Sequence, residues 1–283
     1  MPRHSEFLGP HLQAFCTEYV GTQKRASPHT INSCRDPFRL LLTFMQQTTG
    51  IAPSAVRIAD LALPFMLRFL EHLEQQRGNT VRTRPIRLAA LRGLCRVVAL
   101  RDPASGGQAA QILAIPRTRA PKKLLGALTR GAIEALLATP NRSTWSGRRD
   151  QALLLTLYHT GARVSELAAL TQAPVRFGPT SFVQFLGKGR KERPVPLWPK
   201  TARVLQAWFL ETGATARAPA FPTARGGPLA RAGVASILQL AVRRARTACD
   251  SLHGQRVSPH VIRHSTALHL PQSGVDIAVI ALW

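Results

Sequence analysis

The sequence predicts a mainly α-helical protein with two domains and one small β-hairpin. Apolar residues recur at a spacing of three to four through most of the 283 residues, which is the helical period. A stretch rich in Gly, Pro and basic residues interrupts this pattern between about 104 and 124, and the period changes to two in only one short region. An apolar content of 45% is enough for two modest cores.

The first domain is expected over residues 1–103 and is expected to contain four helices. Apolar side chains return in each of them at the spacing that places them on one helix face, at roughly 8–22, 28–48, 60–76 and 79–100. Gly78 is suited to end the third helix, and Asn79-Thr80 provides a cap for the fourth. This segment is therefore predicted to be a four-helix domain.

Residues 104–124 are predicted to be an extended, positively charged linker. Ser105-Gly-Gly-Gln108 opens the stretch, and Ile115-Pro-Arg-Thr-Arg-Ala-Pro-Lys-Lys123 follows it. Glycine and proline interrupt regular structure, and like charges keep a linker extended.

The second domain is expected over residues 125–283. Helical periodicity resumes there, at about 129–138, 147–159, 163–171, 200–212, 231–248 and 259–271, and another helix begins after Gly274. Between the third and fourth of these helices, the segments 181–186 and 193–197 flank a glycine-rich basic turn, a pattern typical of a β-hairpin. Pro194 and Pro196 lack N–H donors, so the second strand is expected at an edge of the sheet.

The charge of the chain points to a polyanionic partner. Lys and Arg number 38 against 14 Asp and Glu, which gives a formal net charge of +24. Small domains usually carry a net charge of about 2–8 in magnitude, and an excess this large favours nucleic acid as the partner. A genomic preference for arginine would explain arginine in place of lysine, but it would not explain the scarcity of acids.

Other classes of protein receive little support. No apolar run approaches the ~20 residues that span a bilayer, and the N-terminus does not resemble a signal peptide. Cys16, Cys34, Cys95 and Cys249 have no metal-ligand spacing, and free cysteines fit a reducing cytoplasm. The acids of the second domain are scattered singly and no phosphate-binding glycine loop is present, so neither a carboxylate–metal nuclease nor an ATPase is indicated.

Three cationic elements remain as candidates for chemistry. In Ser258-Pro-His-Val-Ile-Arg-His264, Ser258 is a suitable N-cap and Pro259 suits the first helical position. His260 and Arg263 then share one face of the first turn, where a helix N-terminus favours phosphate. A basic helix start that faces solvent explains these residues equally well.

The other two elements are a helix start and the hairpin turn. In Thr160-Gly-Ala-Arg-Val-Ser-Glu-Leu167, Gly161 permits a tight entry, and Glu166 is placed to hold the guanidinium of Arg163. An ordinary surface ion pair is the alternative. Lys188 lies at the tip of the glycine-flanked turn, for which a solvated turn is the alternative.

Together these elements resemble the tyrosine recombinase family, also known as phage integrases. The resemblance rests on Gly161–Leu167, Gly187–Leu197 and His260–His264, in this order; jointly they are specific, although any one alone is not. It covers about residues 125–283, and the four-helix segment before them looks like the SAM-like core-binding domain of that family.

The resemblance implies a set of catalytic roles. Arg163 and Arg263 would clamp the non-bridging oxygens of the scissile phosphate, because a guanidinium can bond two oxygens at once. Lys188 would protonate the leaving 5′ oxygen, and His260 would hydrogen-bond the phosphate and assist proton transfer. In the family a tyrosine attacks the phosphate without a metal, ATP or another cofactor.

The resemblance also implies where the nucleophile belongs. In the family a Leu-Gly-His motif and then the tyrosine follow the segment after Gly274, whereas this sequence ends at Trp283. Its tyrosines are Tyr19, in the first domain, and Tyr158, in an apolar helix, and neither is expected to be a nucleophile. We therefore expect a recombinase of a mobile element that is truncated before its nucleophile helix.

Two functions follow as hypotheses. The first is site-specific DNA recombination or integration, with impaired chemistry in this chain; the alternative is a non-catalytic DNA-binding modulator of full-length recombinases. The expected partners are double-stranded DNA and other recombinase protomers, which form tetramers in the family, and the expected location is the nucleoid within the cytoplasm. The residues expected to contact DNA are basic positions of the linker and the hairpin turn: Arg117, Arg119, Lys122, Lys123, Arg190 and Lys191.

Overall fold

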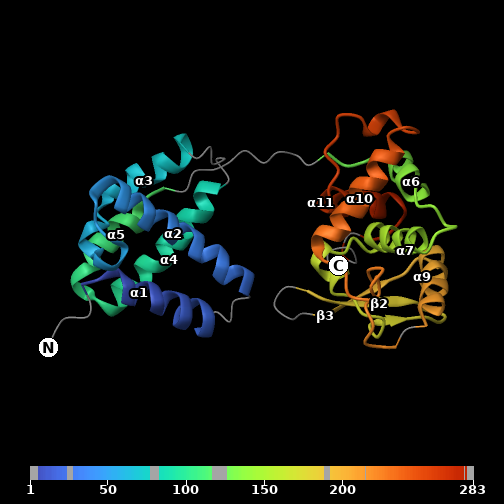
Figure 1. The fold of residues 1–283 in the computed structure, drawn as a ribbon, viewed down its shortest axis with the longest axis horizontal. Coiled ribbons are helices and arrows are strands. Elements are labelled where there is room, and N and C mark those ends of the chain that lie inside the picture. Colours follow the sequence, from blue (N-terminus) through green and yellow to red (C-terminus); the bar gives the residue numbers. More distant parts are fainter. Residues whose placement is uncertain are drawn as a thin grey trace. The chain divides into compact units, whose positions relative to one another are not determined.

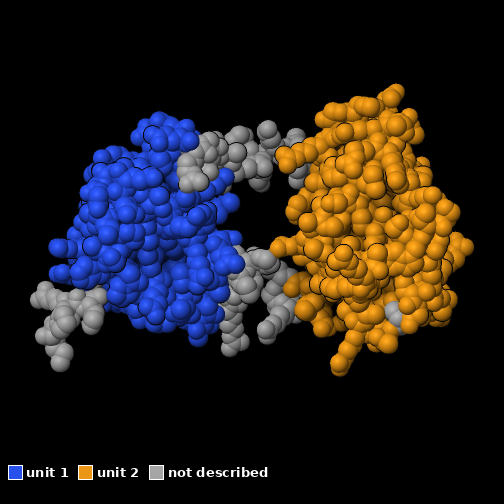
Figure 2. All heavy atoms as spheres, viewed as in Figure 1, with its two compact units in different colours: residues 1–122 blue, residues 123–283 orange. Residues whose placement is uncertain are grey.

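The structure is a computed structural model, which describes residues 6–23, 28–76, 83–116, 126–187, 192–213, 215–276 and 278. It divides into two compact units, residues 1–122 and 123–283 (Figures 1 and 2). Helices dominate both, and the second contains a three-stranded antiparallel sheet, so the predicted fold class is confirmed. Each unit encloses its own cluster of buried apolar side chains.

The regular elements among the described residues of the first unit are helices. Its elements are α1 (Leu8–Ala14) with a π-helical continuation (Phe15–Gln23), α2 (Pro28–Thr49), α3 (Leu63–Gln75), α4 (Thr83–Arg101) and α5 (Gly106–Ala114). Phe69, Leu70, Met45 and Leu91 are among the side chains buried between them. The predicted cap at Asn79-Thr80 lies outside the described residues.

Helix α5 corrects the predicted extended linker. Residues 106–114 are helical rather than extended, because Ala109 and Ile112 bury their side chains in the core of the first unit. The guanidinium of Arg92 on α4 also donates to the carbonyls of Leu113 at 2.5 Å and Ile115 at 2.7 Å, which satisfies the end of the helix. These contacts outweigh the two glycines, each of which costs a helix about 1 kcal/mol. The remainder of the predicted linker, 117–124, lies outside the described residues.

In the second unit the small sheet lies at one end of the helices, below α7 in the view of Figure 1. Its elements are α6 (Arg130–Ala138), α7 (Trp145–Thr160), α8 (Val164–Ala168), β1 (Val175–Arg176), β2 (Phe182–Leu186), β3 (Glu192–Pro196), α9 (Pro199–Thr212), α10 (Arg231–Ala245) and α11 (Pro259–Gln272). Helix α7 packs against both α9 and α11, and its Leu153 and Leu157 are fully buried. This helix is thus the central support of the unit.

The sheet has the order β1–β2–β3, with both neighbouring pairs antiparallel. Strand β3 lies at an edge, as its prolines predict, and Pro194 is paired in register with Gln184. Strand β1 was not predicted, because two residues are too few to show alternation. The predicted helix over 163–171 ends at Ala168, because Leu170 and Thr171 pair instead with the segment around Pro219.

Candidate functional site

A tight turn after α7 places Arg163. Thr160 ends the helix, and Gly161 adopts a left-handed conformation with φ of 56°, which glycine favours. The chain then becomes extended, and Arg163 occupies the N-cap of α8. A Cβ at position 161 would lie 3.5 Å from Thr266 and 3.7 Å from Arg263, so this turn packs directly against α11.

Helix α11 places Arg263 beside the same turn. Its start agrees with the sequence prediction: Ser258 Oγ accepts the N–H of Val261, and Pro259 occupies the first turn. The Nη1 of Arg263 donates to the carbonyl of Gly161. Thr266, one turn later, donates its hydroxyl to the carbonyl of Tyr158. Two side chains of one helix therefore hold the turn that carries Arg163.

Glu166 holds the guanidinium of Arg163, as the sequence predicts. Its Oε1 accepts Nη1 of Arg163 at 2.8 Å, and its Oε2 accepts the backbone N–H of Arg163 at 2.8 Å. Oε2 also accepts Nη2 of Arg193 at 2.6 Å, a contact that the sequence did not predict. Burial raises the pKa of Glu166, but the N–H of Arg163 and the two arginine side chains outweigh it, so that pKa lies below its ordinary value.

The three arginines and the glutamate form one electrostatic cluster. Burial lowers the pKa of Arg263, and the nearby charges of Arg163 and Arg193 lower it further, while Glu166 opposes them. One carboxylate therefore neutralises only part of the charge of three guanidinium groups. The side chain of Arg163 is 46% exposed, so its charge can still be reached from solvent. Such an arrangement can bind an anion with several oxygens, such as a phosphodiester.

Of the remaining predicted site residues, the structure describes His260 only. His260 is exposed in the first turn of α11, three residues before Arg263. Lys188, Arg190 and Lys191 lie outside the described residues, and so do the four predicted DNA contacts of the linker. The structure thus brings Arg163, Glu166 and Arg263 together and places His260 on the helix of Arg263.

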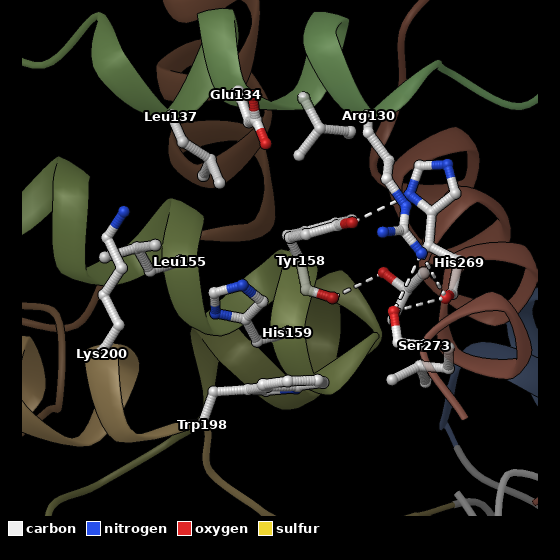
Figure 3. A pocket seen from close by; sticks show the side chains of 13 residues that line it. Arg130, Glu134, Leu137, Leu155, Tyr158, His159, Trp198, Lys200, His269 and Ser273 are labelled. Carbon is white, nitrogen blue, oxygen red and sulfur yellow. Dashed lines mark hydrogen bonds between the residues drawn. The ribbon is translucent and has the colours of Figure 1, made fainter. Parts of the chain in front are cut away.

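A separate cavity of about 230 Å³ lies between α6, α7, α11 and the start of α9 (Figure 3). Tyr158 lines it, and its hydroxyl is hydrogen-bonded to Nδ1 of His269 at 2.8 Å. Arg130 donates to Ser273 Oγ at 2.9 Å and to the carbonyl of His269 at 3.3 Å. Burial raises the pKa of Tyr158, so this hydroxyl ionises less readily than that of an ordinary tyrosine.

The other tyrosine is part of the first unit. The ring of Tyr19 stacks on that of Phe15, with centroids 5.7 Å apart, and packs against the core.

Among the residues that the structure describes, no group of three or more His, Cys, Asp or Glu side chains could hold a metal ion. In the same part of the chain, no helix has the length and apolar character to cross a membrane.

Comparison with known proteins gives one consistent family. Residues 127–282 match the family described as "Phage integrase family". The chain is 41% identical over 283 residues to a Sinorhizobium fredii protein named as integrase/recombinase y4rC, covering 100% of this chain and 85% of that protein. It is 31% identical over 263 residues to tyrosine recombinase XerC of Pelobacter propionicus, covering 93% of this chain and 82% of XerC.

Solved structures share the fold. XerH recombinase bound to its palindromic difH substrate matches with a TM-score of 0.70 and 19% identity, over 96% of this chain and 76% of XerH. A lambda integrase tetramer bound to a Holliday junction matches with a TM-score of 0.66 and 14% identity, over 97% of this chain and 76% of the integrase chain.

Proposed function

This chain belongs to the phage integrase family of tyrosine recombinases, and from that membership we propose that it acts in site-specific DNA recombination by binding duplex DNA and activating one phosphodiester. The observation that carries the proposal is the junction at Gly161. Arg163 follows this residue in the chain, and Arg263 donates to its carbonyl from α11. The turn that carries Arg163 is thereby held against Arg263, which comes from a distant part of the sequence.

In the proposed reaction the two arginines bind the non-bridging oxygens of the scissile phosphate. They stabilise the additional negative charge that develops when a hydroxyl oxygen attacks the phosphorus. A new P–O bond forms as the bond to the 5′ oxygen breaks, and Lys188 supplies the proton that this oxygen takes up. His260 hydrogen-bonds the phosphate and assists proton transfer by taking up the proton that the attacking hydroxyl loses as the new P–O bond forms. One ester bond replaces another, so the exchange needs no ATP.

The attacking hydroxyl is proposed to come from outside these 283 residues. Tyr158 is held by His269 with a raised pKa, and Tyr19 packs in the other unit. A nucleophile has to approach to about 3–3.5 Å before activation can help. We therefore expect no covalent adduct from these residues alone. The same observation favours a second candidate function, that of a DNA-binding modulator of recombinases that carry the tyrosine.

The proposed partners are duplex DNA and further recombinase protomers. The net charge of +24 supports DNA binding. The basic residues proposed to contact its backbone are Arg117, Arg119, Lys122, Lys123, Arg190 and Lys191. We also propose that the N-terminal domain, which includes α5, binds DNA and that residues 125–283 form the catalytic domain. The XerH and lambda integrase structures contain DNA, and the latter is a tetramer, which supports both partners.

The test is a cleavage assay in a mixture. A full-length relative keeps its tyrosine but has its own pocket arginine replaced, and it is mixed with this protein and a nicked suicide duplex that carries the relative's site. We expect a covalent protein–DNA adduct only in the mixture, and we expect Arg263→Gln in this protein to abolish it. Arg148→Gln is the control, because Arg148 pairs with exposed Glu211 on another surface.

Two results would contradict the proposal. Absence of the adduct in the mixture, while both proteins bind the duplex, would favour the modulator function over phosphate activation. An adduct on this protein alone, mapped to Tyr158 or Tyr19, would show that the nucleophile lies within these residues.

A further inference from the structure

We propose that Arg193 is a positioning residue of the phosphate site: through Glu166 it fixes the orientation of Arg163 and couples strand β3 to the turn that carries Arg163. This inference rests on the proposed function, in which Arg163 binds the scissile phosphate. It adds a residue from the sheet to a site that is otherwise built from a turn and a helix.

Arg193 is held from two directions. It is paired in register with Phe185 on β2, and its guanidinium carbon lies 5.2 Å from the centroid of that ring. Its Nη2 donates to Glu166 at 2.6 Å. The side chain of Arg193 is 11% exposed, and Phe185 is 1% exposed. The guanidinium therefore has little freedom, because a buried ring and a buried carboxylate both contact it.

Because Arg193 restricts the carboxylate of Glu166, that carboxylate in turn restricts the side chain of Arg163. Arg193 and the N–H of Arg163 both donate to Oε2, which leaves Oε1 directed at the guanidinium of Arg163. Without Arg193, the donors left to the carboxylate among the described residues would be the backbone N–H and the guanidinium of Arg163, three positions away. Such pairs are weak when solvent can compete for them. The side chain of Glu166 is only 5% exposed while Arg193 is in place.

Arg193 also affects the charge that the site offers to an anion. If Glu166 served Arg163 alone, it would neutralise that guanidinium. Because Arg193 shares the carboxylate, the cluster keeps an excess of positive charge close to the position proposed for the phosphate. The lowered pKa of Arg263 agrees with this, since Arg163 and Arg193 both contribute to it after burial.

The position of Arg193 in the strand gives the contact a second consequence. Arg193 is the second residue of β3, and the residues directly before this strand, 188–191, include Lys188. Movement of the start of β3 would therefore change the Arg193–Glu166 contact and, through it, Arg163. Strand β3 and the residue proposed to bind the phosphate are thus linked through one carboxylate.

The first test measures the ionisation of Glu166 directly. We would titrate its side-chain carboxyl by carbon-13 NMR in the intact 283-residue protein, with Glu166→Gln to assign the signal. Arg193→Leu is expected to raise the pKa of Glu166, and Arg193→Lys, which keeps the charge, to raise it less. Arg148→Leu, which removes the pair with Glu211, should leave it unchanged. An unchanged pKa in Arg193→Leu would overturn the inference.

The second test separates positioning from folding. In the mixed cleavage assay, Arg193→Leu is expected to lower the cleavage rate roughly tenfold, while DNA affinity changes much less. Combined with Arg163→Ala it should cause little further loss, because both changes remove the same contribution. Arg193→Lys should recover part of the rate. Thermal melts of both variants are the control for folding, and we expect cooperative transitions for both.

The outcomes distinguish this inference from the proposed function. Losses that add fully in the double variant, or a rate in Arg193→Leu equal to that of Arg148→Leu, would overturn the positioning role. If the unaltered protein gives no cleavage in the mixture, the proposed function fails, and the titration of Glu166 still decides whether Arg193 controls this carboxylate.

Discussion

Glu166 is the residue on which the candidate site depends most. Its carboxylate has a 5% exposed side chain and contacts Arg163 and Arg193, which the sequence separates by 30 positions. Removing one partner of a buried ion pair leaves the other charges uncompensated, which costs more than the loss of an exposed pair. We expect Glu166→Gln to lower the free energy of unfolding by about 3 kcal/mol in urea denaturation. Glu211→Gln, the exposed counterpart, should leave it nearly unchanged.

The contribution of Glu166 should depend on pH in a defined direction. Its folded pKa is lowered from 4.5, so the stabilisation is complete above that value and is lost as the pH falls through the folded pKa. The difference in unfolding free energy between the unaltered protein and Glu166→Gln should therefore shrink as the pH is lowered below about 4.5. A difference that stays constant across this range would contradict the ionic role of this residue.

His159 offers a second test at the scale of single residues. Burial, and next the charge of Lys200, lower the pKa of His159 from 6.5 to about 4. The folded protein therefore binds this proton less readily than the unfolded chain, and the contribution of His159 is lost as the pH falls from 6.5 towards 4. This group should cost up to about 1.4 kcal/mol of stability for each pH unit in that window. His159→Gln should remove that part of the slope in denaturation experiments at several pH values.

At the scale of elements, the turn between α7 and α8 can be compared with a matched turn elsewhere. Gly161 and Gly213 both end a helix with nearly the same left-handed conformation, with φ of 56° and 55°. Alanine at either position should lower the free energy of unfolding by about 1 kcal/mol, because L-residues disfavour that conformation. Only Gly161→Ala should also lower cleavage in the mixed assay, since only this turn contacts Arg263. Equal cleavage in both variants would separate the turn from the site.

The elements differ in how far their sequences predict them. Helix α11 could be predicted at its start, because Ser258 and Pro259 are local signals for an N-terminus and the structure uses both. Helix α5 could not, because its two glycines suggest a linker and the burial of Ile112 depends on another helix. The contact between Arg193 and Glu166 joins residues 27 apart, and no local pattern announces it. The features that the sequence predicts are thus those determined by residues close together in the chain.

At the scale of the whole molecule, charge should govern binding. The excess of 38 Lys and Arg over 14 Asp and Glu predicts affinity for duplex DNA that falls steeply with salt, since bound phosphates release counterions. Replacing Arg117, Arg119, Lys122 and Lys123 by Ala should weaken binding to unrelated duplexes alike and reduce the salt slope. Fluorescence anisotropy over a salt series measures both quantities. Exchanging Arg for Lys and Lys for Arg at the same positions is the control, which should preserve binding.

The register of β2 and β3 also determines where the gene can lose or gain codons without disturbing the hairpin. Side chains alternate between faces along β3, so Arg193 and Val195 share the inner face while Pro194 faces outward. Loss of one codon between positions 188 and 191 would shorten only the connection before the strand. Loss of the codon for Arg193 would instead place Glu192 or Pro194 opposite Phe185 and would remove the contact with Glu166. Natural length variation in this hairpin should therefore be confined to the codons of its connection.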